Sequence, residues 1–206
     1  MRRPKTLLEI AEADFRWPKN GDRLLRASTD WGKGADFSAH PMSRDVHIWT
    51  GYMRAGAALV EECERENLDR NFLVYPILFN YRHALEVAIK WVIDTYGRYA
   101  GVRLPVGKRD HNLWILWGFC KDIILKLGTD NGDGTIEVVE GIVKEFHDLD
   151  KSSFAFRYSR NKLGSTIPLP DDSIDLRNVK DVMEAVDNFF SGVDGELDAN
   201  VSAVDW

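Results

Sequence analysis

The spacing of apolar residues along the chain predicts helices. The longest apolar stretch, residues 72–93, carries two neighbouring stripes at steps of three or four residues. A helix that is apolar on several sides suits the centre of a helical bundle. Pro76 lacks a backbone N–H, so we expect it in the first turn of this helix or at a kink.

Four further stretches each carry a single apolar stripe. They span residues 44–67, 111–127, 136–149 and 175–190, and a shorter helix is expected over residues 6–15. Ser43 and Asp110 are the expected N-caps of the helices that follow them. Gly51 and Gly56 either weaken the first long helix or mark the close approach of a partner helix. Because no stretch has a convincing strand pattern, we predict an all-α fold, an antiparallel helical bundle of five or six helices.

The connecting segments suggest a three-part organisation. Residues 1–43 contain the short helix and a Gly-containing loop, which Trp31 and Phe37 are expected to hold against the body of the protein. Residues 44–190 form the bundle. Within the bundle, residues 150–170 have no helical period and predict an extended ordered segment before the last helix. Residues 191–206 are acidic and predict a mobile tail.

Composition and charge narrow the functional classes. The 206 residues carry a net charge of −6, which argues against a broad DNA-binding surface but leaves room for a local basic pocket. The two cysteines lie far apart in helical patterns, as is typical of reduced cytosolic thiols. No stretch is apolar enough for a membrane span, so a cytoplasmic protein is expected. Phosphate loops and dinucleotide fingerprints are missing from the sequence, and we expect no cofactor.

Several charged residues lie where an apolar core is predicted. Arg82, Glu86 and Lys90 follow one another at four-residue steps on the most apolar helix, and they stack on one face of it. We expect them to converge with His83, a neighbour on the same helix, and with four residues from distant parts of the sequence: His111, Asp150, Arg157 and Tyr158. Charges in such a setting are costly unless they are paired.

Two interpretations of these residues remain open. In the first, they line a pocket where arginines hold a phosphate or carboxylate and a histidine transfers a proton. In the second, they form a closed structural network, in which Glu86 or Asp150 pairs with an arginine and fixes the last segment on the bundle.

The order of three short motifs resembles the HEPN-domain superfamily. The motifs are Y-R-H-A-L-E-x-x-x-K at residues 81–90, H-N-L-x-x-L-W at residues 111–117, and D-x-x-S-x-x-F-R-Y at residues 150–158, with Ser153 as the serine. The resemblance spans residues 44–190. It implies an antiparallel bundle, homodimerisation and association with RNA or nucleotides. Many members are metal-independent ribonucleases in which an arginine is followed, after four to six residues, by a histidine.

This chain departs from the ribonuclease pattern. In many members asparagine directly follows that arginine, and Arg160 and Asn161 supply such a pair. The histidine should then follow at residues 165–167, but these are Ser, Thr and Ile. The corresponding positions after Arg82 are Val, Ala and Ile. The sequence therefore predicts a non-catalytic HEPN-like binding or interaction module for RNA or a nucleotide, and a homodimer. The alternative is a metal-independent endoribonuclease with a shifted site built from Arg82, His83, His111 and Arg157.

A third possibility comes from the stretch between two predicted helices. Residues 129–140, TDNGDGTIEVVE, resemble a calcium-binding EF-hand loop, with Asn131, Asp133 and Glu140 as candidate ligands. Thr129 stands where the loop needs its first carboxylate. The same residues also suit an ordinary turn rich in Gly, Asp and Asn. Calcium binding and a simple helix connection both remain open.

Overall fold

The computed structural model describes residues 16, 18–65, 69–105, 111–128, 132–151 and 153–204. The chain divides into two compact units, Met1–Phe37 and Ser38–Trp206. The described residues of the first unit contain no helix or strand, and Trp31 and Phe37 are 95% and 93% exposed. Their expected contact with the bundle stays a prediction. The helix expected over residues 6–15 lies outside the described residues.

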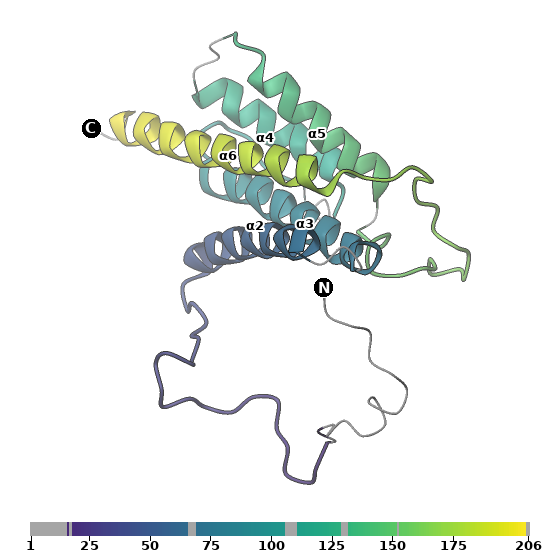
Figure 1. The fold of residues 1–206 in the computed structure, drawn as a ribbon. Coiled ribbons are helices and arrows are strands. Elements are labelled where there is room, and N and C mark those ends of the chain that lie inside the picture. The colour runs from purple at the N-terminus through teal and green to yellow at the C-terminus, as the bar shows by residue number, and fades with distance from the viewer. Residues whose placement is uncertain are drawn as a thin grey trace. The chain divides into compact units, whose positions relative to one another are not determined.

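The second unit is built from helices, which confirms the all-α prediction. Five helices pack against each other (Figure 1): α2 (Pro41–Arg65), α3 (Arg70–Tyr96), α4 (Leu113–Leu127), α5 (Thr135–Leu149) and α6 (Leu176–Val204). The part of the chain that the structure describes contains no strand, only an isolated β-bridge between Arg160 and Thr166. The segment that precedes α6 is non-helical, as predicted.

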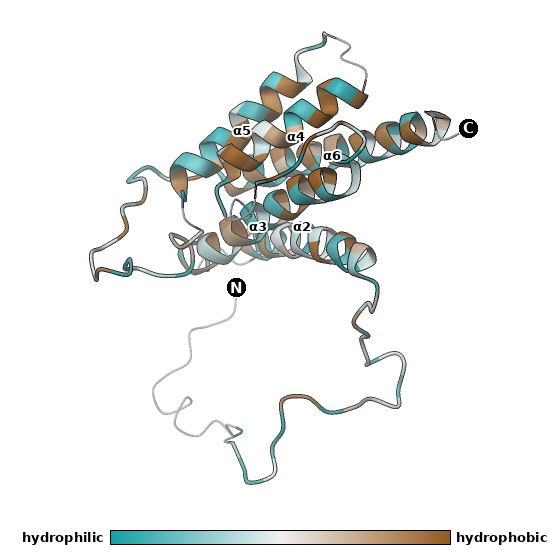
Figure 2. Cartoon of the chain, turned by 180° about the vertical axis from the view of Figure 1, so that it is seen from behind, coloured by the Kyte–Doolittle hydropathy of each residue, from teal (hydrophilic) through white to brown (hydrophobic). Residues whose placement is uncertain are grey.

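Helix α3 is the central element. It packs against α2, α4 and α6, and it buries twelve residues: Ile77, Leu78, Tyr81, Arg82, Ala84, Leu85, Glu86, Ala88, Ile89, Val92, Ile93 and Tyr96. Pro76 lies inside the helix, beyond its first turn. The colouring by hydropathy shows apolar and polar faces alternating around α4 and α5 (Figure 2), as one-sided burial requires. No helix in the described ranges is long and apolar enough to cross a membrane.

A glycine allows α2 and α3 to approach closely. A Cβ atom added to Gly56 would lie 2.8 Å from the ring of Tyr81, whereas one added to Gly51 would meet nothing within 4 Å. The close-approach interpretation is therefore correct for Gly56 and wrong for Gly51. Tyr81 itself is 1% exposed, so its ring has little room to move aside.

Two helix starts differ from the sequence predictions. Helix α2 begins at Pro41, so Ser43 lies in its first turn instead of capping it. Proline suits a first helical position because its missing N–H would have no partner there. Helix α4 begins at Leu113 after an N-cap at Asn112, whose Oδ1 accepts the backbone N–H of Ile115 at 3.1 Å. His111 therefore precedes this helix, and Asp110 lies outside the described residues.

The last helix is longer than predicted. Helix α6 continues past Phe190 to Val204, and it buries Val193 and Leu197 in the core. Asp194 accepts hydrogen bonds from Trp91 Nε1 at 2.8 Å and from the Tyr96 hydroxyl at 2.6 Å. The prediction of a separate tail from residue 191 is wrong for the described residues 191–204. Two glycines and several acids hid a helical apolar spacing in this stretch.

Candidate functional site

The charged ladder of α3 points into the protein. Arg82 is fully buried and Glu86 is 2% exposed, although both side chains are charged. Both lie on α3, the helix with the largest share of core residues. The four-residue spacing brings Arg82 Nη1 to 3.1 Å from Glu86 Oε2. A buried charge without partners is costly, so each of these groups needs further hydrogen bonds.

Arg82 connects three parts of the fold. Its Nη2 donates to the carbonyl oxygen of His111 at 2.8 Å and to that of Asp150 at 3.1 Å. Its Nε donates to the same Asp150 carbonyl at 3.2 Å and lies 3.5 Å from Asp150 Oδ2. One guanidinium thus holds His111, two residues before α4, and Asp150, the residue after α5, against α3.

Glu86 is the second centre of the network. Its Oε1 receives hydrogen bonds from Lys90 Nζ at 2.7 Å and from His111 Nδ1 at 2.8 Å. Burial alone would raise the pKa of the Glu86 carboxyl, but the bonds from Lys90 and His111 outweigh it and hold that pKa below its ordinary value. The side chains of Lys90 and His111 are 25% and 55% exposed, so the network reaches solvent only at this edge.

Asp150 extends the network into the segment that follows α5. Its Oδ1 accepts the backbone N–H of Phe154 at 2.9 Å. Ser153 has a φ of 63°, a left-handed conformation that is uncommon for a non-glycine residue, and its carbonyl accepts Arg157 Nε at 2.8 Å. The buried pair of Arg82 and Asp150 therefore fixes a tight turn that presents Arg157 at the surface.

Around Arg157 lies a group of aromatic and cationic side chains, which we call the Arg157 cluster. Its members are Tyr52, Phe79, His83, Phe154, Arg157, Tyr158 and Lys162. The Arg157 guanidinium lies 5.5 Å from the ring centre of Phe79, 5.2 Å from that of Phe154 and 5.5 Å from that of Tyr158. Contacts of this kind are favourable cation–π interactions.

His83 belongs to this cluster, apart from the buried network. Its ring stacks on Phe79 at 5.7 Å between centres and meets the edge of Tyr52 at 4.5 Å. Burial lowers the pKa of His83 below its ordinary value, because a charged imidazole is poorly solvated there. This half-buried ring is thus kept neutral near pH 7.

The structure therefore divides the eight predicted residues into two sets. Arg82, Glu86, Lys90, His111 and Asp150 form the network. His83, Arg157 and Tyr158 lie in the Arg157 cluster instead.

Sequence reasoning missed four members of that cluster as site residues: Tyr52, Phe79, Phe154 and Lys162. One sequence signal points to two of them. Residues 151–170 contain four cations, Lys151, Arg157, Arg160 and Lys162, and neither Asp nor Glu. Phe154, Phe156 and Tyr158 lie among those cations, and a mixture of basic and aromatic residues is typical of nucleic-acid contact.

We call residues 151–170 the basic segment. Residues 159–167 within it form a hairpin-like loop. Asn161 N–H donates to the Ser165 carbonyl at 2.9 Å, and Ile167 N–H donates to that of Ser159 at 3.0 Å. Gly164 takes a φ of 81°, which a turn of this kind requires and glycine permits. The loop exposes Leu163 at its tip by 91%. Its own backbone bonds thus hold it in a defined shape away from the core.

The calcium hypothesis receives no support from Glu140. This carboxylate accepts Trp117 Nε1 at 2.8 Å and Lys121 Nζ at 2.9 Å, which turns it toward α4. Asp133 Oδ1 accepts the backbone N–H of Thr135 at the start of α5. Among the described residues no group of three or more His, Cys, Asp or Glu side chains could hold a metal ion. Asn131 lies outside those residues, so the complete loop stays untested.

Comparison with protein families, with curated proteins and with solved structures gives no match for this chain. The HEPN resemblance therefore stays a prediction, and the functional argument depends on the geometry of the chain itself.

Proposed function

We propose that this protein is a non-catalytic binding module that contacts single-stranded RNA through the basic segment and the Arg157 cluster. The observation that carries the proposal is the arrangement of Arg157 among three aromatic rings, with Tyr158 53% exposed beside it. Exposed rings can stack on unpaired bases, while nearby cations attract the phosphate backbone. The association with RNA or nucleotides that the HEPN resemblance implies agrees with this chemistry.

The distribution of charge supports binding of a nucleic acid at one local region. The protein as a whole carries a net charge of −6, so attraction to nucleic acid has to come from one basic region. The basic segment supplies four cations without an acid. A short strip of this kind suits a flexible single strand, whose bases are free to reach the rings, better than the regular backbone of a long duplex.

The buried network argues against catalysis at the same residues. Arg82 is fully buried and donates to the carbonyl oxygens of His111 and Asp150 as well as to Glu86. Stabilising a phosphate would require it to leave these partners. His83 and His111 are held in different environments, one by aromatic rings and the other by Glu86. Two histidines acting on one phosphate would need a shared accessible site. We place the protein in the cytoplasm, where its buried free thiols Cys63 and Cys120 stay reduced.

Binding of a labelled mixed-sequence single-stranded RNA, measured by fluorescence anisotropy, tests the proposal. We expect Tyr158→Ala to weaken binding about tenfold through the loss of stacking. Lys162→Ala is expected to reduce the slope of log affinity against log salt by about 1.

The chain supplies a matched control. Arg98 and Tyr99 form a second Arg-Tyr pair, with the Arg98 guanidinium 4.4 Å from the Tyr99 ring centre and Tyr99 39% exposed. This pair follows the C-terminal end of α3, away from Phe79. Tyr99→Ala should leave RNA affinity unchanged. Equal losses in Tyr99→Ala and Tyr158→Ala, or no measurable RNA binding, would contradict the proposal.

A further inference from the structure

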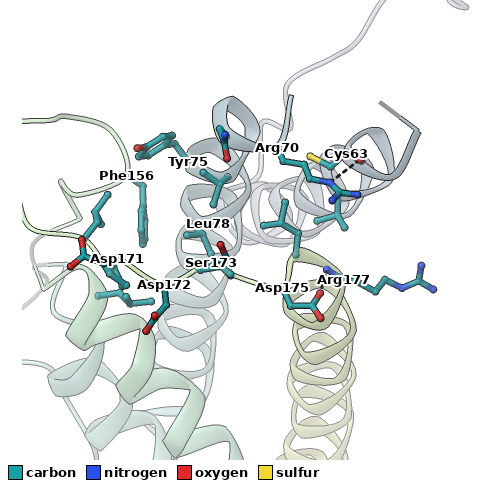
Figure 3. A pocket seen from close by; sticks show the side chains of 18 of the residues that line it. Cys63, Arg70, Tyr75, Leu78, Phe156, Asp171, Asp172, Ser173, Asp175 and Arg177 are labelled. Atoms are coloured by element: carbon teal, nitrogen blue, oxygen red, sulfur yellow. Dashed lines mark hydrogen bonds between the residues drawn. The ribbon is translucent and has the colours of Figure 1, made fainter. Parts of the chain in front are cut away.

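A second surface feature shares no residue with the Arg157 cluster. It is a groove of 640 Å³ bounded by the end of α2, the start of α3 and the segment that leads into α6, which we call the α6 groove. Figure 3 shows Asp171, Asp172 and Asp175 along that segment, with Tyr75 and Leu78 on α3. Its apolar lining includes Val60, Val74, Leu78, Leu149, Phe156 and Leu169. The groove is large enough to bind more than one aliphatic side chain.

The charged rim of the α6 groove has an excess of two negative charges. It contains four carboxylates, Glu64, Asp171, Asp172 and Asp175, and two guanidinium groups, Arg70 and Arg177. This combination of an apolar lining and an acidic rim favours a ligand that is both apolar and basic.

Two of the four rim carboxylates are already used. Glu64 pairs with Arg177 at 2.6 Å. Asp175 Oδ1 accepts the backbone N–H groups of Arg177 and Asn178 at the start of α6. Asp171 and Asp172 are exposed and have no hydrogen bond or ion pair within the described ranges. These two carboxylates are the ones available to an incoming cation.

The chain contains a segment with the complementary chemistry. Residues 23–26 read Arg-Leu-Leu-Arg. Leu24 is 98% exposed and Leu25 is 80% exposed, and an arginine flanks them on each side. Together they form a small apolar patch that is open to a partner.

We propose that the α6 groove binds residues 23–26 of a second copy of this protein. The two leucines enter the apolar lining, and Arg23 and Arg26 pair with Asp171 and Asp172. A four-residue contact is far smaller than a standard protein interface, so the self-association is weak and depends on concentration. Exposed ion pairs contribute to it, so salt weakens it.

This proposal is independent of RNA binding. The α6 groove and the Arg157 cluster have no residue in common, although Phe156 and Leu169 of the basic segment line the groove. The rim of the groove is acidic and repels RNA. Tyr158→Ala should therefore leave self-association unchanged, and loss of groove binding should leave RNA affinity unchanged. Failure of one proposal thus does not imply failure of the other.

Sedimentation of the full chain over a range of concentrations tests the proposal. The wild type should increase in mean mass with concentration. Asp171→Arg combined with Asp172→Arg should weaken self-association tenfold or more, and so should Arg23→Asp combined with Arg26→Asp. Each variant alone should lose association. An equimolar mixture of the two should recover it, because the segment made acidic in one variant can pair with the groove made basic in the other. The control is Glu145→Arg combined with Asp198→Arg, at exposed positions outside the groove. It changes the net charge by the same amount as Asp171→Arg combined with Asp172→Arg, and it should behave as the wild type.

Two results would overturn the inference. The first is a monomeric mass at every concentration, or a mixture that fails to recover association although circular dichroism shows both variants folded. The second is failure of a peptide with the sequence of residues 18–30 to bind the full chain. That result would assign the groove to a different basic partner.

Discussion

Arg82 shows how a charge is accommodated in the core of this bundle. Its guanidinium has an ionic partner in Glu86, a second carboxylate in Asp150, and two backbone carbonyls as acceptors. Such a group stabilises the fold only while all its partners remain, since removing one member leaves the others buried and uncompensated. The network therefore acts as a structural connection between α3, α4 and the basic segment.

Replacing Arg82 tests this role. Arg82→Met should lower the free energy of unfolding by about 3–5 kcal/mol, because Glu86 and Asp150 then remain buried without their cation. Urea denaturation followed by circular dichroism measures the change. The double variant Arg82→Met with Glu86→Leu should recover part of the loss, since it also removes one buried charge. A loss below about 1 kcal/mol for Arg82→Met would show that the network is not structural.

Glu86 makes stability depend on pH in a defined direction. Its pKa in the folded protein lies below the ordinary value of 4.5, because the hydrogen bonds from Lys90 and His111 outweigh the effect of burial. Its contribution is thus fully present above pH 4.5 and is lost as the pH falls through the folded pKa. The free energy of unfolding of the wild type should decrease below pH 4.5 more steeply than that of Glu86→Gln, as measured by urea denaturation at a series of pH values. Parallel curves would contradict this assignment.

At the scale of the elements, apolar periodicity was enough to find the five helices and to place α3 at the centre. The same periodicity could not predict that the polar residues of α3 lie in two different environments. Arg82 and His83 are neighbours in sequence, but consecutive helical residues point about 100° apart. One therefore enters the buried network while the other meets Phe79 and Tyr52. That division depends on the positions of α2 and the basic segment, which local spacing does not contain.

The close contact of α2 with α3 gives a matched pair of glycine variants. Gly56→Ala places a methyl group 2.8 Å from the buried Tyr81 ring, so it should lower the free energy of unfolding by about 1–3 kcal/mol through overpacking. Gly51→Ala lies in open space on the same helix and should raise that free energy by up to about 1 kcal/mol, because alanine favours helix formation. Thermal or urea denaturation of both variants measures the difference. Stabilisation by both substitutions would show that the two helices are able to separate at Gly56.

At the scale of the whole molecule, the two proposed binding surfaces carry opposite charge. The basic segment attracts a polyanion in an otherwise acidic protein, and the α6 groove offers carboxylates to a basic segment. The buried network lies beneath the basic segment and holds the turn that carries Arg157. Rigid support of this kind suits recognition, because a contact surface that is already ordered loses less entropy on binding.

The central claim is that this protein binds single-stranded RNA without cleaving it. Incubation of the full chain with an end-labelled single-stranded RNA in excess chelator, analysed in parallel by anisotropy and on a denaturing gel, tests both halves of that claim. We predict saturable binding that weakens with salt and with Tyr158→Ala, while the RNA stays intact. Cleavage that is abolished by His111→Ala would contradict the account, and it would instead support a metal-independent ribonuclease with a shifted site.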